Sequence, residues 1–91
     1  MATREWEMGL TKQEIFEIVR EHIVEVLGDV DPADISPEKS MVELGANSVD
    51  RLEVTTLSMA TLGLQIPLMS FAKVNDIGGL IDVLTEHALK G

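Results

Sequence analysis

The chain has 91 residues, of which 45% are hydrophobic, and its 16 acidic and 7 basic residues give a formal net charge of −9. This length suits one small domain with its own core, and the negative charge disfavours nucleic acid, whose phosphates it would repel. The sequence has no cysteine, which excludes disulfides, thiolate metal sites and cysteine nucleophiles. No apolar run approaches the roughly 20 residues of a membrane span, and no signal-peptide core is present. We therefore expect a cytoplasmic protein without a membrane partner.

Residues 1–10 show no periodicity, and we expect a flexible N-terminal tail before a single domain at 11–91. Trp6 either covers an edge of that domain or belongs to an interaction segment. A first helix is predicted from Thr11 to Leu27, because Thr11 and Glu14 form a capping-box pattern. Gly28 is a natural stop. The apolar residues at helical spacing give this helix a core face: Ile15, Ile18, Val19, Ile23, Val26 and Leu27.

Residues 28–47 contain prolines, glycines and many aspartates and serines, which predicts a long loop. A loop of this length needs anchors, and we expect a short helical turn near Pro37–Met41. The apolar residues expected to pin the loop are Val30, Ile35, Met41, Val42 and Leu44.

A second helix is predicted from Ser48 to Leu62, after a tight turn at Gly45. Both Asn47 and Ser48 favour a helix N-terminus. The helix has charges only at Asp50, Arg51 and Glu53, and no ionisable acid or base follows until after Ala72. Its apolar residues are either buried on two faces, or they form an exposed neutral patch that selects a partner. We favour the patch, because losing charge costs solubility.

A short third helix is expected at Leu68–Lys73, with Phe71 turned inward. The last helix should be capped by Asn75 or Asp76 and run to about His87. Its apolar stripe has helical spacing: Ile77, Leu80, Ile81, Leu84 and Ala88. The predicted fold is therefore all-α, a four-helix bundle of three longer helices and one short helix with a long first loop.

The segment Gly45-Ala46-Asn47-Ser48-Val49 resembles the Gly-x-Asp-Ser-Leu motif of acyl and peptidyl carrier proteins, with Asn47 in place of aspartate and Val49 in place of leucine. The similarity extends over residues 11–89 and includes the long loop. This resemblance implies that Ser48 bears a 4'-phosphopantetheine arm, which a phosphopantetheinyl transferase adds from coenzyme A, with Asn47 beside it. We expect Gly78 and Gly79 to permit a close approach of the arm or of the third helix.

The chemistry of Ser48 fits that role, since its oxygen can carry a phosphodiester and a helix N-terminus favours an anion. Two other interpretations are weaker. Ser48 alone would be read as a helix cap, and a serine hydrolase would need a base and a nucleophile elbow, for which only His22 and His87 are available. We therefore predict a protein that is not an enzyme. We also expect no metal site, since Asp29, Asp31 and Asp34 lack the EF-hand spacing.

The segment 47–51 and the uncharged second helix are similar to the donor carriers of β-branching cassettes in polyketide assembly. The resemblance implies a monomer that takes a malonyl group from an acyltransferase. A decarboxylating ketosynthase-like enzyme then converts malonyl to acetyl, which passes to an HMG-synthase-like enzyme. The alternatives are a carrier for fatty-acid, peptide or D-alanine loading, or an unmodified helical adaptor. By analogy, the candidate partner face comprises seven residues: Asp50, Arg51, Leu52, Val54, Thr55, Met59 and Phe71.

Overall fold

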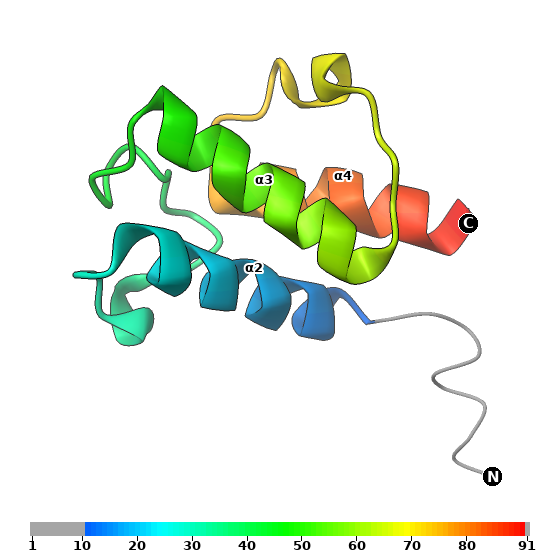
Figure 1. Ribbon diagram of the computed structural model, residues 1–91. Coiled ribbons are helices and arrows are strands. Elements are labelled where there is room, and N and C mark those ends of the chain that lie inside the picture. Colours follow the sequence, from blue (N-terminus) through cyan, green and yellow to red (C-terminus); the bar gives the residue numbers. More distant parts are fainter. Residues whose placement is uncertain (1–10, 91) are drawn as a thin grey trace, which may run out of the picture.

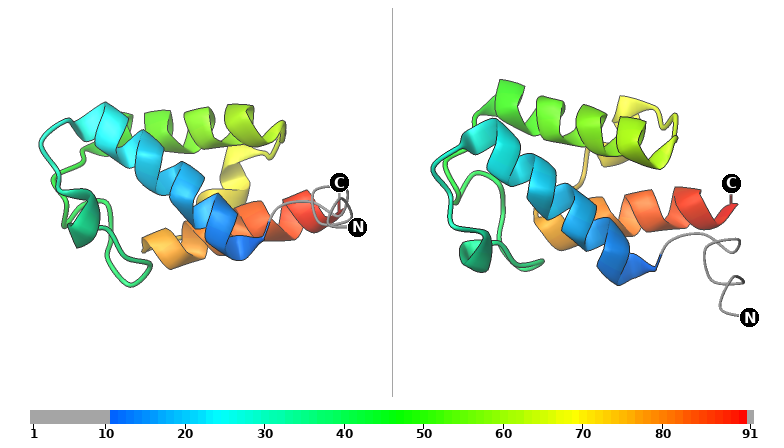
Figure 2. Two further views of the ribbon diagram at one scale, coloured as in Figure 1. Left: turned by 90° about the horizontal axis from the view of Figure 1, so that it is seen from below. Right: turned by 60° about the horizontal axis from the view of Figure 1, so that its bottom comes forward.

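The computed structural model describes residues 11–90, so the expected tail with Trp6 lies outside the described residues, as does Gly91. The described part contains three α-helices and two 3₁₀ segments and no strand: α2 (Lys12–Leu27), η1 (Pro32–Asp34), α3 (Ser48–Leu62), η2 (Leu68–Phe71) and α4 (Ile77–Lys90). Helices α3 and α4 run in the same direction, and α2 runs the opposite way (Figure 1). Two further views show α2 lying at an angle across the other two helices (Figure 2). The prediction of an all-α fold with a long first loop is therefore confirmed.

Local caps define both ends of α2 and the end of α3, as the sequence predicts. The hydroxyl of Thr11 accepts a hydrogen bond from Glu14 N at 3.1 Å, while a Glu14 carboxylate oxygen accepts one from Thr11 N at 2.8 Å. Gly28 and Gly63 follow the two helices with φ of +82° and +70°, values that favour glycine. These helix ends depend on neighbouring residues alone, which explains why the sequence predicts them well.

The core is supplied unequally by the three helices. In α2, Ile15, Val19 and Ile23 are buried, and α4 buries the predicted stripe from Ile77 to Leu84. By contrast, α3 contributes a single fully buried apolar side chain, Val54. At the start of α3, Val49 is 70% exposed and Leu52 is 49% exposed, whereas Met59 and Leu62 further along are partly buried against the core. The exposed-patch interpretation therefore holds for the start of α3, and the selection of a partner by this patch stays a prediction.

Two expectations for the long loop are wrong. The 3₁₀ segment lies at Pro32–Asp34, where Asp31 caps it by accepting a hydrogen bond from Ala33 N at 2.9 Å. Proline also suits the first position of such a segment. Near Pro37–Met41 the chain makes a hydrogen-bonded turn, in which Lys39 N donates to Ser36 O at 3.1 Å, but no helical segment. Val42 does not pin the loop, since its side chain is 58% exposed. The loop is anchored by Ile35, which is buried, and by the partly buried residues that pack against the core: Val30, Met41 and Leu44.

The third and fourth helices also differ in detail from the expectation. The short one is a 3₁₀ segment that ends at Phe71, before Lys73, and α4 continues past His87 to Lys90. Asp76, rather than Asn75, caps α4, because its carboxylate accepts a hydrogen bond from Gly79 N at 2.7 Å.

The long loop satisfies the first N–H groups of α4, which have no partner within the helix. Ile77 N donates to Lys39 O at 2.9 Å, and Gly78 N donates to Pro37 O at 2.7 Å. A Cβ atom added to Gly78 would lie 3.1 Å from Pro37 O. The close approach at Gly78 is therefore made by the long loop and not by the third helix.

We predict that Gly78→Ala lowers the free energy of unfolding by about 1 kcal/mol, although alanine is normally the better helix former. The new methyl group would press on a backbone carbonyl that is itself hydrogen-bonded. Gly79→Ala is the matched control, since its Cβ would meet the end of the Asp76 side chain, at 3.2 Å. Urea denaturation measures both. Equal stabilities of the two variants would contradict this account of Gly78.

Candidate functional site

Ser48 is the first residue of α3, and it is exposed. The helix is capped by its neighbour instead: Asn47 Oδ1 accepts a hydrogen bond from Asp50 N at 2.8 Å, and Asp50 Oδ2 accepts one from Asn47 N at 3.2 Å. Because Asn47 does the capping, the Ser48 hydroxyl is not needed by the helix backbone. The interpretation of Ser48 as a mere helix cap is therefore wrong.

The turn before α3 determines that Ser48 is exposed to solvent. Gly45 has φ of +98°, a conformation that favours glycine. Ala46 is 6% exposed, and its N–H donates to Met41 O at 3.0 Å. With Ala46 turned into the protein, Ser48 emerges on the outer side of the first helical turn.

Arg51 provides the one side-chain hydrogen bond that Ser48 makes within the described part of the chain. Its Nη2 atom donates a hydrogen bond to Ser48 Oγ at 3.2 Å. Residues three apart on a helix lie on the same side, so the guanidinium stands directly beside the hydroxyl. The partial positive charge of the helix N-terminus adds to it. The surroundings of Ser48 thus suit an attached anion.

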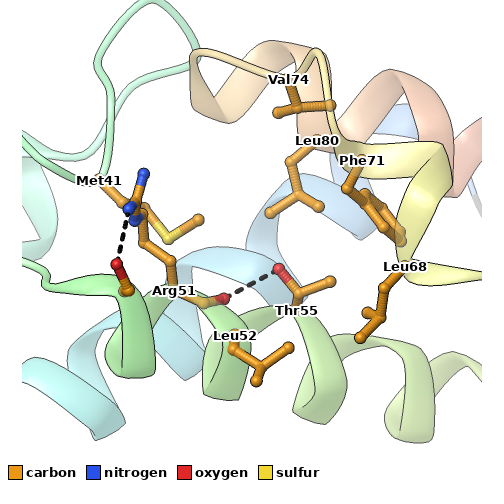
Figure 3. Close-up of a pocket in the computed structure, with 9 residues that line it drawn as sticks. Met41, Arg51, Leu52, Thr55, Leu68, Phe71, Val74 and Leu80 are labelled. Carbon is orange, nitrogen blue, oxygen red and sulfur yellow. Dashed lines mark hydrogen bonds between the residues drawn. The ribbon is translucent and has the colours of Figure 1, made fainter.

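A cavity of about 210 Å³ opens beside Ser48, between α3, the long loop, η2 and α4. Met41 and Arg51 lie at one end of it, and Leu68 and Phe71 lie at the other (Figure 3). Thr55 also lines the cavity, and its hydroxyl donates to Arg51 O at 2.9 Å. The walls are mainly apolar, with polar groups gathered near Ser48.

The structure brings together most, though not all, of the candidate partner residues. Ser48, Arg51, Leu52, Thr55 and Phe71 line this cavity, although Thr55 is only 8% exposed.

The remaining candidates lie elsewhere. Asp50 is occupied by the capping box with Asn47, and Met59 lines a separate hollow near Pro67. The prediction that Val54 belongs to the partner face is wrong. Val54 is 0% exposed and packs in the core, so it does not form part of a partner surface.

Sequence reasoning missed the apolar exposure around η2. Leu68 is 53% exposed and Met69 is 83% exposed, and Leu68 lines the same cavity as Leu52. We use the name apolar patch for the exposed apolar residues of these two elements: Val49, Leu52, Leu68 and Met69. The available signal was the run Leu68-Met69-Ser70-Phe71 after Pro67. So short a 3₁₀ segment cannot bury three large apolar side chains on one side.

Neither histidine is arranged as a base for Ser48. His22 contacts Thr61 Oγ1 through Nε2 at 2.8 Å and Glu25 Oε1 through Nδ1 at 3.1 Å. His87 Nδ1 contacts Val83 O at 3.0 Å. Residues 11–88, whose side chains the structure describes, therefore contain no serine–histidine pair at Ser48.

A small helical bundle that presents a serine beside a guanidinium, with the helix capped by another residue, has the site that a carrier domain needs. A family model described as "Phosphopantetheine attachment site" matches residues 17–84. The chain belongs to this phosphopantetheine-attachment family and is an acyl carrier protein, a carrier and not a catalyst. Its prosthetic group is 4'-phosphopantetheine.

Named relatives agree with this assignment. The chain is 44% identical over 77 residues to the polyketide biosynthesis acyl-carrier-protein AcpK of Bacillus subtilis (strain 168), a match covering 85% of this chain and 94% of the relative. It is 32% identical over 80 residues to the meromycolate extension acyl carrier protein of Mycobacterium leprae (strain TN), covering 87% of this chain and 69% of that protein.

Among solved structures, the fold resembles a chain in the crystal structure of the curacin biosynthetic pathway HMG synthase in complex with acetyl donor-ACP. The TM-score is 0.78 and the identity 27%, and the match covers 85% of this chain and 99% of that chain. Between residues 11 and 90, no helix combines the length and the apolar character needed to cross a membrane.

We predict that Asn47→Ala lowers the free energy of unfolding of the unmodified protein by about 1 kcal/mol, because the cap of α3 is lost. Asn47→Asp is the matched control and should stay within about 0.5 kcal/mol of the wild type, since aspartate caps equally well. Urea denaturation followed by circular dichroism measures both variants. If alanine were tolerated as well as aspartate, Asn47 would not be the working cap.

Proposed function

We propose that Ser48 Oγ is the atom to which the 4'-phosphopantetheine arm is attached. The observation that carries this proposal is the division of roles at the start of α3: Asn47 caps the helix, and Ser48 remains exposed beside Arg51. Free backbone N–H groups of the first turn and the Arg51 guanidinium would face the phosphate. The arm supplies a terminal thiol, which holds the acyl group as a thioester.

A phosphopantetheinyl transferase is the partner that this attachment requires. Ser48 Oγ attacks the phosphorus of coenzyme A that bears the pantetheine. The bond from that phosphorus to the bridging diphosphate oxygen breaks, and adenosine 3',5'-bisphosphate leaves. The hydroxyl proton passes to a base of the transferase, because the described residues place neither histidine against Ser48. The exposed position of Ser48 gives the transferase access.

We further propose that the protein is an acetyl donor for an HMG-synthase-like enzyme in a polyketide pathway. An acyltransferase and a decarboxylating ketosynthase-like enzyme would supply the acetyl group by way of malonyl. Two observations support this proposal. The solved structure reported above is named as an HMG synthase with its acetyl donor-ACP, and the relative from Bacillus subtilis is named for polyketide biosynthesis.

The proposed contact surface joins the apolar patch to the candidate residues around the cavity. Val49, Leu52, Leu68 and Met69 are 49% to 83% exposed and lie on the same two elements, α3 and η2. Exposed apolar patches on a protein with a strong net charge mark contact sites. Asp50 and Arg51 would flank this surface at the start of α3.

A second candidate function is a carrier for fatty-acid elongation, which the resemblance to the meromycolate extension carrier protein favours. The acyl group that the modified protein accepts separates the two. Acetyl or malonyl loading followed by transfer to an HMG-synthase-like enzyme supports the donor role, whereas long-chain loading supports elongation. Peptide or D-alanine loading would appear as aminoacylation.

The cellular setting is also part of the proposal. We propose that residues 11–91 form the carrier domain, that residues 1–10 form a separate tail, and that the protein acts as a monomer in the cytoplasm. The core described above, built from α2, α3 and α4 within one chain, supports the monomer.

We predict that incubation with coenzyme A, Mg²⁺ and a broad-specificity transferase adds the mass of one phosphopantetheine group to the wild type and none to Ser48→Ala. The alanine variant should retain the circular dichroism spectrum, because Asn47 rather than Ser48 caps α3. Ser70→Ala is the control, since Ser70 is an exposed serine of η2, and it should be modified normally. A mass gain on Ser48→Ala would refute the attachment site.

We predict that Leu52→Glu lowers kcat/KM for acetyl transfer to the curacin HMG synthase at least tenfold, because it puts a carboxylate into the apolar patch. Modification by the transferase and stability should change little, since Leu52 is half exposed. Gln13→Glu adds the same charge on α2, and it is the control. Transfer of radiolabelled acetyl is the measurement. Equal rates for the two variants would show that the patch does not contact this enzyme.

A further inference from the structure

Arg51 is a cation in a place that electrostatics disfavours. It is the fourth residue of α3 and exposed, and a helix N-terminus repels positive charge. Among the residues whose side chains the structure describes, Lys12 Nζ pairs with Asp82 Oδ1 at 2.8 Å. Within that part of the chain, Arg51 has no carboxylate partner, although the protein as a whole carries a net charge of −9.

The neighbouring carboxylate is engaged elsewhere. Asp50 turns toward the start of the helix, where its Oδ2 accepts the hydrogen bond from Asn47 N. The Arg51 side chain is directed to Ser48 instead, and its Nη2 donates to Ser48 Oγ at 3.2 Å. A neutral hydroxyl is a weak partner for a guanidinium, whose planar fork of N–H groups matches the oxygens of a phosphate.

A phosphate on Ser48 would supply the missing anion. Its non-bridging oxygens lie two bonds from Oγ, and Arg51 is already within hydrogen-bond distance of Oγ. We propose that Arg51 is a positioning residue that binds the phosphodiester of the arm. This inference rests on the proposed attachment at Ser48, and it assigns Arg51 a role within the carrier rather than on the partner surface alone.

The position of Arg51 gives this contact a consequence for the arm. The guanidinium lies at the end of the cavity that Met41 also lines (Figure 3). Asn47, the other residue beside Ser48, is neutral, so no carboxylate at that position competes for Arg51. The phosphate end is therefore held on the cavity side of α3 instead of turning freely about Oγ.

Nuclear magnetic resonance of the full chain tests the contact directly. We expect the Arg51 Nε–Hε signal to shift and to exchange more slowly with water when the apo protein becomes holo, and the Arg20 signal to stay unchanged. High salt should reduce the shift, because Arg51 and Ser48 are both exposed and salt weakens an exposed ion pair. An Arg51 signal that is identical in the apo and holo forms would overturn the proposal.

Variants add a second, independent measurement on the arm itself. In the holo protein, the ³¹P signal of Arg51→Gln should move toward that of free phosphopantetheine and sharpen. Arg51→Lys should lie between, because lysine keeps the charge but lacks the fork. Arg20→Gln removes a distant guanidinium on α2 and should leave the ³¹P signal unchanged. A ³¹P signal that is the same in all four proteins would overturn the proposal.

Intact mass separates the two levels of failure. If the wild type gains no phosphopantetheine mass, the attachment at Ser48 is wrong, and the role of Arg51 falls with it. If the mass is gained but neither the Arg51 nor the ³¹P signal responds, only the role of Arg51 is overturned. Should the transferase reject Arg51→Gln, the comparison of apo and holo wild type decides alone.

Discussion

The capping box between Asn47 and Asp50 is the interaction on which the site depends. Had Ser48 been the residue that satisfies the first N–H groups of α3, its oxygen would point at the helix backbone. Asn47 accepts the Asp50 N–H instead, and Ser48 is displaced by one residue onto the outer side of the first turn. One hydrogen bond of ordinary strength thus separates the structural role from the chemical role of two adjacent residues.

The long loop contacts the starts of both α3 and α4. Its middle part supplies the carbonyls of Pro37 and Lys39 to the free N–H groups of α4, and its last turn is closed by the bond from Ala46 N to Met41 O. The starts of α3 and α4 therefore lie at the same end of the bundle (Figure 1). Loops as long as this one usually need such anchoring, and the cavity beside Ser48 is bounded by the segment that provides it.

The uneven distribution of charge along the surface follows from how little of α3 is buried. Its large apolar side chains Val49 and Leu52 are exposed, and its second half contains no acidic residue. Most of the protein's acidic side chains lie on other elements, including the exposed Glu14, Glu17 and Glu21 of α2. The protein keeps a strongly negative surface while leaving an apolar patch beside the proposed attachment serine, which suits repeated, short-lived contacts with several enzymes.

The sequence by itself determined the ends of α2 and α3, the buried stripe of α4 and the class of protein, because caps, helical spacing and the motif around Ser48 are local patterns. The contact between Arg51 and Ser48 is also local, but the spacing of residues in a sequence does not determine the rotamer of the Arg51 side chain. Only the tertiary structure decided that Val54 lies in the core, that the backbone of Pro37 packs closely against Gly78, and that Met69 in η2 stays exposed. Each of these depends on which segments distant in sequence meet, and on how much room they leave.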